Sequence, residues 1–221
     1  ELAPTPEERV AREVERARFL LEKGRVEQAD RAWSALAARV DETEEYPAEQ
    51  IQRLGAQGLM GLHVPEEYGG SDAGALAFCL AAEEIAAACA ATSTIFLVQN
   101  LGGYPIILAG NAEQKKRFLP RLAAGEITAA FSLSESGSGS DAAGMQCAAV
   151  RKGDRYVVNG SKMWVTNGSH AGVLTVFVST DRGRRGRGVT ALLVEPGTRG
   201  FSVGKHEKKL GIRGSPTVAL H

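Results

Sequence analysis

The chain has 221 residues, 43% of them hydrophobic and 24% charged. This length and composition predict a globular chain of one large or two smaller domains and exclude a disordered or fibrous protein. The 26 basic residues balance the 26 acidic ones, so nothing supports a general attraction to nucleic acid or to an anionic membrane. No apolar run reaches the roughly 18 residues of a membrane span, because Glu83 and Glu84 interrupt the most apolar stretch, residues 73–98.

The first part of the chain has helical periodicity. Residues 7–41 mix glutamate and arginine with apolar residues at helical spacing, which predicts one or two amphipathic helices around Gly24. Further helices are predicted at residues 48–56, 76–91, 95–109 and 112–123. Asn111 is the predicted N-cap of the last of these helices. We therefore predict an all-α N-terminal domain over residues 1–125.

Beyond residue 125 the pattern changes to short β-branched runs separated by glycine-containing turns. Strands are predicted at residues 127–134, 147–151, 156–158, 162–166, 173–180, 189–194 and 217–220. Lys152-Gly153-Asp154 and Asn159-Gly160 are predicted to be tight hairpin turns. Because such turns leave no room for crossover helices, this connectivity excludes a Rossmann-like sheet. We predict an antiparallel β-sandwich or flattened barrel over residues 126–221, and an α+β multidomain fold for the chain.

The cysteines and histidines indicate neither a disulfide framework nor a metal site. Cys79, Cys89 and Cys147 are an odd number at wide spacing, and the four histidines have no second ligand at metal spacing. We assign no metal and expect the cysteines to be small buried hydrophobes. The first residues contain no charged and apolar leader, so we expect a secretory or organelle peptide to be absent or removed.

A glycine- and serine-rich segment, residues 134–141, follows the first predicted strand. Small residues let the backbone approach a ligand, and free hydroxyl and N–H groups suit a pyrophosphate or the edge of a flavin ring. The alternative is a flexible linker between the helical and sheet parts, which composition alone favours. The segment is not a Walker-type phosphate loop, because it lacks the Gly-Lys-Ser/Thr ending.

Residues 159–168 place Trp164 and Thr166 on one face of a predicted strand, because alternate residues share a face. An indole beside a hydroxyl could stack on a planar ring and hydrogen-bond to its edge. The alternative, which these residues alone favour, is that Trp164 is a core anchor between two sheets.

Arginines are concentrated in residues 181–188, between two predicted strands. Guanidinium groups suit phosphates, so this segment indicates a phosphate-bearing ligand. The alternative is a hairpin tip that is charged for solubility alone.

Five separated segments match motifs that recur together in one known family. Its Thr-Glu-Pro-x-Ala-Gly-Ser-Asp loop is matched by residues 134–141, and its Asn-Gly-x-Lys-x-Trp-Ile-Thr-Asn-Gly segment by residues 159–168. Its Pro-Glu-Glu-Tyr-Gly-Gly, Gly-x-x-x-Gln-Lys and Lys-x-Gly-x-x-x-Ser-x-Thr motifs are found at residues 65–70, 110–115 and 209–217. On these residues the chain resembles the acyl-CoA dehydrogenase family, from about residue 47 to residue 221.

The resemblance implies FAD held between a helical domain and a β domain, with flavin N5 accepting a hydride from the β-carbon of an acyl-CoA. By motif, Leu133 and Ser134 would contact the isoalloxazine edge, Trp164 would stack against the ring, and Thr166 would hydrogen-bond near N5. The implied cofactor-binding residues are Phe131, Leu133, Ser134, Gly139, Ser140, Trp164, Val165 and Thr166. Ser134 replaces the family's threonine and keeps the hydroxyl donor, whereas Ser136 replaces a proline, which predicts a less rigid loop.

The resemblance also implies substrate contacts. Ser140 would approach the pantetheine of CoA, and Arg185 and Arg187 are candidate ligands of its 3′-phosphate. The face that would form the floor of the acyl pocket comprises Thr94, Leu97, Val98 and Leu101. Two bulky side chains in this set, Leu97 and Val98, predict a short or branched acyl group. The alternative is that they are simple core residues.

Members of the family remove the α-proton with a glutamate of a C-terminal helical domain, so we assign no catalytic residue in this chain and do not put Glu135 in that place. We expect the 221 residues alone to bind FAD weakly and to show no turnover. The resemblance further implies an electron-transfer flavoprotein as electron acceptor and a dimer or tetramer. It also implies a location in the bacterial cytoplasm or the mitochondrial matrix.

Two other functions stay open. The same scaffold could act on acyl carrier protein thioesters, or as a flavin oxidase or monooxygenase, because a fold does not fix a function. A non-catalytic, DNA-binding member of the family is the other alternative, which the zero net charge disfavours.

Overall fold

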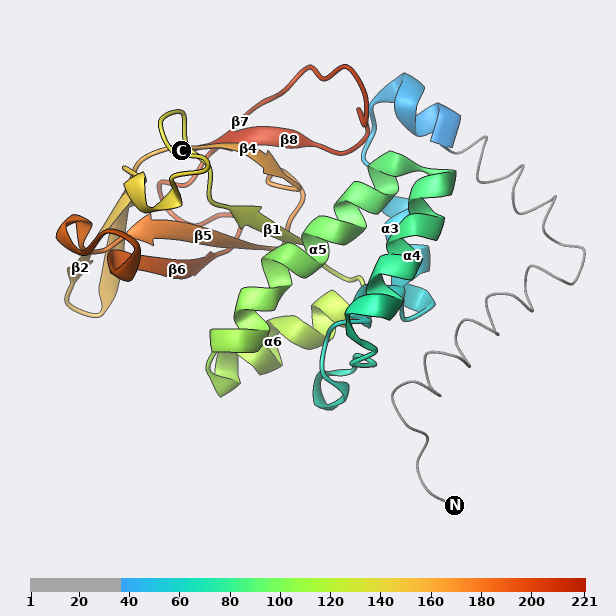
Figure 1. Cartoon of the computed structure of the whole chain (residues 1–221), viewed down its shortest axis with the longest axis horizontal. Helices are drawn as coiled ribbons and strands as arrows, with labels where there is room; N and C mark the ends of the chain where they lie inside the picture. Colours follow the sequence, from blue (N-terminus) through green and yellow to red (C-terminus); the bar gives the residue numbers. More distant parts are fainter. Residues whose placement is uncertain (1–36) are drawn as a thin grey trace, which may run out of the picture.

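The computed structural model describes residues 37–221. The first part of this range is helical and the second part consists of two sheets, with the helices gathered on one side of the strands (Figure 1). This arrangement confirms the predicted α+β class and the order of its two parts. Most of the helical region predicted for residues 7–41 lies outside the described residues, and residues 37–43 are helical.

The longer helices of the described range closely follow the predicted ones. They are α3 (Ala48–Ala56), α4 (Gly74–Ala88), α5 (Ala90–Ala109) and α6 (Ala112–Ala123). Short 3-10 turns at Leu59–Gly61 and Glu66–Tyr68 connect α3 to α4. The Asn111 side chain accepts the Gln114 N–H at 2.9 Å, and the Gln114 side chain accepts the Asn111 N–H. This reciprocal capping box confirms Asn111 as the N-cap of α6.

The helices enclose an apolar core. Phe78 of α4 stacks on Phe96 of α5 with ring centroids 4.7 Å apart. The buried residues around this pair are Ile51, Leu54, Met60, Leu62, Ala82 and Ile95. A second cluster joins α5 and α6 to the first strand through residues such as Ile106, Leu119 and Ala129. Helices α5 and α6 are therefore packed on the larger of the two sheets through β1 (Ala129–Ser132).

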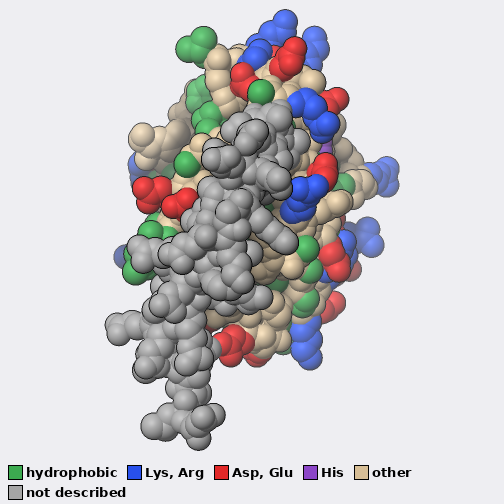
Figure 2. Space-filling view, turned by 90° about the vertical axis from the view of Figure 1, so that its right-hand side faces the viewer, with side chains coloured by type: hydrophobic (Ala, Val, Ile, Leu, Met, Phe, Trp, Pro, Cys, Tyr) green, Lys and Arg blue, Asp and Glu red, His purple; other side chains and the backbone are tan. Residues whose placement is uncertain are grey.

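Charged side chains of both signs are interspersed on the helical side of the molecule. In Figure 2, lysine and arginine lie beside aspartate and glutamate, with no large area of one sign among the coloured atoms. Arg53, for example, pairs with Glu49 at 2.6 Å. This face therefore offers no broad basic area to a nucleic acid. Within residues 37–221, no helix has both the length and the apolar character that crossing a membrane requires.

Two sheets make up the second part. The strands are β1 (Ala129–Ser132), β2 (Ala148–Lys152), β3 (Arg155–Asn159), β4 (Lys162–Thr166), β5 (Val173–Ser179), β6 (Val189–Val194), β7 (Val203–His206) and β8 (Thr217–Leu220). The larger sheet has the order β1-β5-β2-β3, with β6 also paired to β5, and the smaller has the order β4-β8-β7. The sequence did not predict β7, whose four residues include a glycine and two charged or polar side chains.

The larger sheet is not purely antiparallel, so that part of the prediction is wrong. β1 pairs with β5 in parallel, with Ala129 opposite Val173, and β2 meets β5 in parallel at Ala148 and Ser179. The remaining pairs, β2 with β3, β5 with β6, β4 with β8 and β7 with β8, are antiparallel. Tight turns determine only how neighbouring strands pair, whereas β1 and β5 are brought together across three intervening strands.

Of the two predicted hairpin turns, one is confirmed and one is wrong. β2 and β3 form an antiparallel hairpin in which Lys152 lies opposite Arg155, and Gly153 has the positive φ that such a tight turn requires. Asn159-Gly160 instead carries the chain from the larger sheet to the smaller one, because β3 pairs with β2 and β4 pairs with β8. A Cβ at Gly160 would lie 2.6 Å from the Cys147 Cα, so glycine permits a close backbone crossing here.

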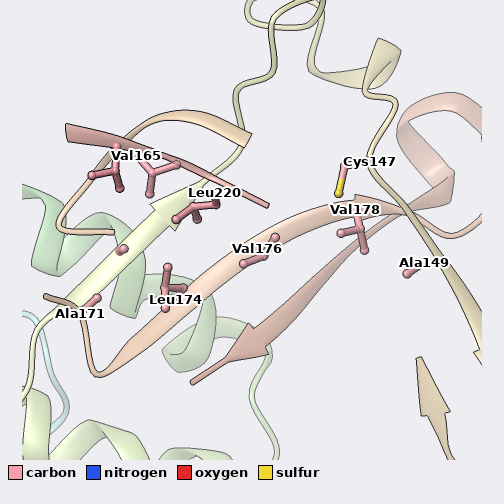
Figure 3. Close-up of a cluster of buried hydrophobic side chains, with 10 residues drawn as sticks. Cys147, Ala149, Val165, Ala171, Leu174, Val176, Val178 and Leu220 are labelled. Carbon is pink, nitrogen blue, oxygen red and sulfur yellow. The ribbon is translucent and has the colours of Figure 1, made fainter. Parts of the chain in front are cut away.

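The core of the sheet part lies between the two sheets (Figure 3). Leu174, Val176 and Val178 of β5 face Val165 of β4 and Leu220 of β8. The cluster is completed by Ala130, Cys147, Ala149, Ala171 and Val218. These contacts confirm the predicted packing of two sheets.

Contacts of Gln99, Gly102 and Thr175, together called the joint below, fix α5 against β1. The buried Gln99 side chain donates to the Leu122 carbonyl and accepts the Ala129 N–H, each at 2.9 Å. At Gly102 a Cβ would lie 2.8 Å from the Ala129 Cβ, so only glycine lets the helix approach this closely. The Thr175 hydroxyl donates to the Gly102 carbonyl at 2.7 Å. Helix and strand are thus held as one unit.

Candidate functional site

The glycine- and serine-rich segment, called loop 133–141 below, is an ordered part of the sheet region. The N–H and C=O groups of Glu135 and Ser138 bond to each other, and the Ser138 hydroxyl donates to the Asp141 carbonyl at 2.6 Å. Glu135 and Ser138 are buried. The loop leaves β1 and returns to β2 of the same sheet. It is therefore not a linker between the helical part and the sheet part.

A buried ion pair anchors the start of this loop to β4. The Lys162 ammonium, on a side chain only 2% exposed, lies 2.7 Å from Glu135 Oε1, on a side chain 7% exposed. The same ammonium donates to the Leu133 carbonyl at 2.9 Å. The Glu135 carboxylate also accepts the N–H groups of Gln146 and Cys147, at 2.6 and 3.0 Å. The pair thus joins the two sheets and meets the requirement that buried charges be paired and hydrogen-bonded.

The surroundings of Glu135 make it unsuitable as a proton-abstracting base. Burial alone would raise the pKa of its carboxyl group, but hydrogen bonds from Lys162 and from the N–H groups of Gln146 and Cys147 outweigh burial and lower the pKa. A carboxylate with a lowered pKa is a weak base, and its oxygens are already occupied by these donors. The structure thus gives a physical reason to exclude Glu135 from that role.

Strand β4 brings residues 159–168, called the tryptophan motif below, next to loop 133–141. The Met163 N–H donates to the Ser134 carbonyl at 3.0 Å, so Trp164 lies one residue from this contact. Trp164 has φ of 56° at a bulge in β4, and the residue is 62% exposed. Such exposure excludes the interpretation of Trp164 as a core anchor. Thr166 is half-buried and, like Trp164, is more exposed than the intervening Val165.

Two of the predicted cofactor residues have restricted side chains. Val165 is buried between the sheets, so any contact with a ligand would involve its backbone. Phe131 packs at a tilt against Phe177, with ring centroids 4.9 Å apart, and is half-buried. Both side chains are therefore held by packing inside the protein, in contrast to the exposed indole of Trp164.

The residues around loop 133–141 fit a flat, polar-edged cofactor such as a flavin. Ser134 is half-buried, and among residues 37–221 no acceptor is assigned to its N–H or hydroxyl. Gly139 and Ser140 are exposed, and a Cβ at Gly139 would meet nothing within 4 Å. The exposed indole of Trp164 adds an aromatic face. Open backbone, free donors and an aromatic surface are thus adjacent.

The arginine-rich residues form the 3-10 segment Arg182–Gly188, called the arginine segment below, between β5 and β6. Arg182 donates to the Gln146 carbonyl at 2.7 Å, and Arg185 lies 3.5 Å from the Asp141 carboxylate. Arg187 is exposed. A shallow depression lies here, lined by Ala143, Gly144, Met145, Gln146, Ser179, Arg182 and Arg185. The fold therefore brings the arginine segment to the far end of loop 133–141, which the sequence did not predict.

The four residues predicted to line the acyl pocket lie on α5. Leu97 and Leu101 are 43% and 50% exposed, which excludes a core role for these two side chains. Val98 is half-buried, and the Thr94 hydroxyl donates back to the Ala90 carbonyl at 2.9 Å. This face of α5 is thus apolar and open.

Sequence reasoning missed Lys162 and Asn167, although both lie within the tryptophan motif. The buried Asn167 amide donates to the Ala129 carbonyl at 3.2 Å, and its N–H donates to the Pro216 carbonyl. A lysine in an otherwise apolar strand was a usable signal, because a buried ammonium requires a partner. Within the described residues, no group of three or more His, Cys, Asp or Glu side chains is arranged to hold a metal ion.

Comparison with known proteins agrees with this geometry. The family models for the N-terminal and middle domains of acyl-CoA dehydrogenases match residues 21–126 and 130–221. Over 195 residues the chain is 42% identical to the human mitochondrial short-chain specific acyl-CoA dehydrogenase. This alignment covers 87% of this chain and 47% of the relative.

Two solved structures are similar to the fold. Butyryl-CoA dehydrogenase from Megasphaera elsdenii has a TM-score of 0.79 at 37% identity, covering 84% of this chain and 51% of that one. A glutaryl-CoA dehydrogenase from Mycobacterium smegmatis, in complex with FADH2, has a TM-score of 0.76 at 33% identity, covering 91% and 54%. The chain spans about half the length of the curated relatives it matches. It belongs to the acyl-CoA dehydrogenase family.

Proposed function

We propose that the protein catalyses FAD-dependent α,β-dehydrogenation of an acyl-CoA thioester. The observation that carries this proposal is the hydrogen bond from the Met163 N–H to the Ser134 carbonyl, which holds an exposed indole next to a loop with free donors. When bound, FAD supplies the acceptor for the hydride that leaves the substrate β-carbon. Relatives whose names specify butyryl-CoA and FADH2 support both the substrate class and the cofactor.

The residues around loop 133–141 would bind and orient the flavin. We assign Leu133 and Ser134 to the isoalloxazine edge, Trp164 to stacking on the ring, and Thr166 to a hydrogen bond near N5. Gly139, whose surroundings are open, would let the backbone approach the cofactor. Phe131 and Val165, whose side chains are packed below, would support this surface.

The arginine segment would hold the phosphate end of the substrate. Arg185 and Arg187 are exposed, and within residues 37–221 the partner of Arg185 is the Asp141 carboxylate at 3.5 Å, a contact that an incoming phosphate can displace at small cost. Ser140 lies in the loop between this segment and the flavin residues and would contact the pantetheine. Arg185→Glu should raise KM strongly for CoA esters and little for carrier-protein esters. Equal effects on both would reject the assignment.

The open face of α5 would cover a short or branched acyl group. Leu97 and Leu101 present exposed apolar side chains, and the joint at Gln99 and Gly102 fixes this helix relative to β1. The name of the butyryl-CoA relative supports a short chain. Turnover of long-chain substrates far above that of four-carbon substrates would contradict this assignment.

We do not assign the α-proton base to Glu135, because it is held in its ion pair with a lowered pKa. We further propose an electron-transfer flavoprotein as acceptor, a homo-oligomeric assembly and a role in fatty acid breakdown.

The experiment that tests the function follows flavin absorbance in purified protein carrying these residues. Oxidised flavin that copurifies or is reconstituted should bleach when butyryl-CoA is added without oxygen. Faster bleaching by a carrier-protein thioester would instead favour that alternative. Absence of flavin binding, together with a mobility shift of DNA at physiological salt, would support the non-catalytic alternative.

A further inference from the structure

The buried Lys162 makes a contact that its ion pair alone does not require. Besides the Glu135 carboxylate at 2.7 Å, its ammonium donates to the Leu133 carbonyl at 2.9 Å. The next residue of the same strand, Met163, donates its N–H to the Ser134 carbonyl at 3.0 Å. Two consecutive carbonyls of loop 133–141 are thus held from β4, one by a charge and one by the backbone.

Glu135 connects the same ion pair to the residues that precede β2. Its carboxylate accepts the N–H groups of Gln146 and Cys147, which lead into β2, while it binds Lys162 of β4. The pair therefore links the loop to both sheets at once. Lys162 donates two hydrogen bonds and Glu135 accepts three within this buried network, which restricts the pair to one geometry.

The contact at Leu133 has a chemical consequence for Ser134. The carbonyl of Leu133 and the N–H of Ser134 belong to the same peptide group, so an ammonium bonded to the carbonyl polarises the N–H and makes it a stronger donor. Among residues 37–221 no acceptor is assigned to this N–H. The charge of Lys162 is thus transmitted to an open donor at the proposed flavin edge.

We propose that Lys162 is a positioning residue, which fixes and polarises the Leu133–Ser134 peptide so that its N–H meets the flavin edge. The proposal rests on the proposed function, because it requires a flavin at loop 133–141. A donor at the ring edge favours the more electron-rich reduced flavin. Loss of Lys162 should therefore weaken FAD binding and make the reduction potential of bound flavin more negative.

The test measures FAD affinity, the reduction potential of bound flavin and the unfolding midpoint in the protein carrying these residues. Lys162→Met removes the ammonium and keeps an unbranched side chain of similar length. The double variant Lys162→Met with Glu135→Gln removes both charges, so no lone charge remains buried. The control is Arg117→Met, which breaks the exposed 2.5 Å pair between α6 and Glu195.

We expect Lys162→Met to bind FAD about tenfold or more weakly, with a more negative potential. The double variant should regain much of the lost stability while keeping both flavin defects, and it decides the question if the single variant does not fold. Arg117→Met should leave FAD affinity and potential unchanged. Recovery of affinity and potential together with stability in the double variant would show that Lys162 only stabilises the fold and would overturn the proposal.

Failure of the proposed function is distinguishable from this outcome. If the unsubstituted protein binds no FAD, the flavin site itself is wrong, and the role of Lys162 is rejected with it. If the unsubstituted protein binds FAD and Lys162→Met matches its affinity and potential, only the positioning role is rejected.

Discussion

Loop 133–141 is held near each of its two ends by an ion pair, and one pair is buried whereas the other is exposed. Near its start, Lys162 and Glu135 are buried, 2.7 Å apart, and surrounded by further hydrogen bonds. At its other end, Arg185 and Asp141 are exposed and 3.5 Å apart. The first pair has no freedom to change partners, whereas the second can exchange with solvent or an incoming anion.

The difference in burial between the two ion pairs suits the two ends of the loop to different roles. A buried network of hydrogen bonds keeps the Leu133–Ser134 backbone in place beside Trp164, where we propose that the flavin binds. The exposed arginines cost little to reorganise, which suits contact with a mobile phosphate group. Motif matching assigned residues to the flavin and to CoA, but only the geometry distinguishes the fixed end from the adaptable one.

The largest effect on stability is expected from Glu135→Ala. This change leaves the Lys162 ammonium buried without its carboxylate and removes the acceptor of the Gln146 and Cys147 N–H groups. The free energy of unfolding should fall by about 3 to 5 kcal/mol, measured by urea denaturation. Asp141→Ala, which breaks the exposed pair at the other end, is the matched control. Equal losses in the two variants would remove the distinction between the ends.

The pH dependence distinguishes a paired buried group from an unpaired one. Burial lowers the pKa of His63 from 6.5 to about 4, and within residues 37–221 neither ring nitrogen has a hydrogen-bond partner. Because the unfolded state binds the proton first, stability is lost as the pH falls from 6.5 to about 4. The loss should reach about 3 kcal/mol.

His63→Leu should abolish this loss and leave the acid-side loss that comes from Glu135. The pKa of Glu135 is lowered in the fold, so its contribution to stability is present above the ordinary pKa of 4.5 and disappears as the pH falls through the folded pKa. Denaturation curves at several pH values measure the stability loss in the pH range of His63 and in that of Glu135. A wild-type slope that persists in His63→Leu would contradict the role of His63.

The joint between α5 and β1 can be tested at two adjacent glycines. In Gly102→Ala the new Cβ would lie 2.8 Å from both the Ala129 Cβ and the Ala130 carbonyl oxygen, so unfolding free energy should fall by about 1 to 3 kcal/mol. In Gly103→Ala the nearest atoms are at 3.5 Å or more, and the gain in helix propensity should stabilise the protein by up to about 1 kcal/mol. Changes in unfolding free energy of opposite sign in the two variants, measured by thermal or urea denaturation, would support the close contact of α5 with β1. Changes of the same sign would contradict it.

The smallest effect on stability is expected at the adaptable end of the loop. Arg185→Ala removes one exposed ion pair with Asp141 and should change the unfolding free energy by less than about 1 kcal/mol. The same variant should raise KM for CoA esters, because it removes a proposed phosphate contact. A large stability loss without a KM change would reverse the roles given to the two ends.

Local rules predicted much of the fold. Asn111 precedes a helical pattern and has Gln114 at the position that a capping box requires, and Gly153 lies between two short β-branched runs. These signals involve residues a few positions apart. The parallel pairing of β1 with β5 was not predictable in this way, because the partners are more than forty residues apart and no turn connects them directly.

The sequence motifs proposed residues for the candidate site but did not show which residues hold them in place. Motifs identified Ser134, Trp164 and Thr166, but no pattern showed that Lys162 would reach Glu135 and the Leu133 carbonyl from another sheet. The exposure of Trp164 follows from a bulge and a positive φ, which regular alternation does not predict. Side-chain partners across sheets depend on tertiary packing, which sequence spacing does not contain.

The most direct test of the flavin site is titration with FAD, followed by tryptophan emission. The chain has two tryptophans, Trp33 and Trp164, and only Trp164 is assigned to the ring. We expect saturable quenching by FAD in the unsubstituted protein and loss of most of that quenching in Trp164→Phe, with FAD binding still detectable by flavin fluorescence. Undiminished quenching in Trp164→Phe would contradict the placement of the flavin beside β4 and loop 133–141.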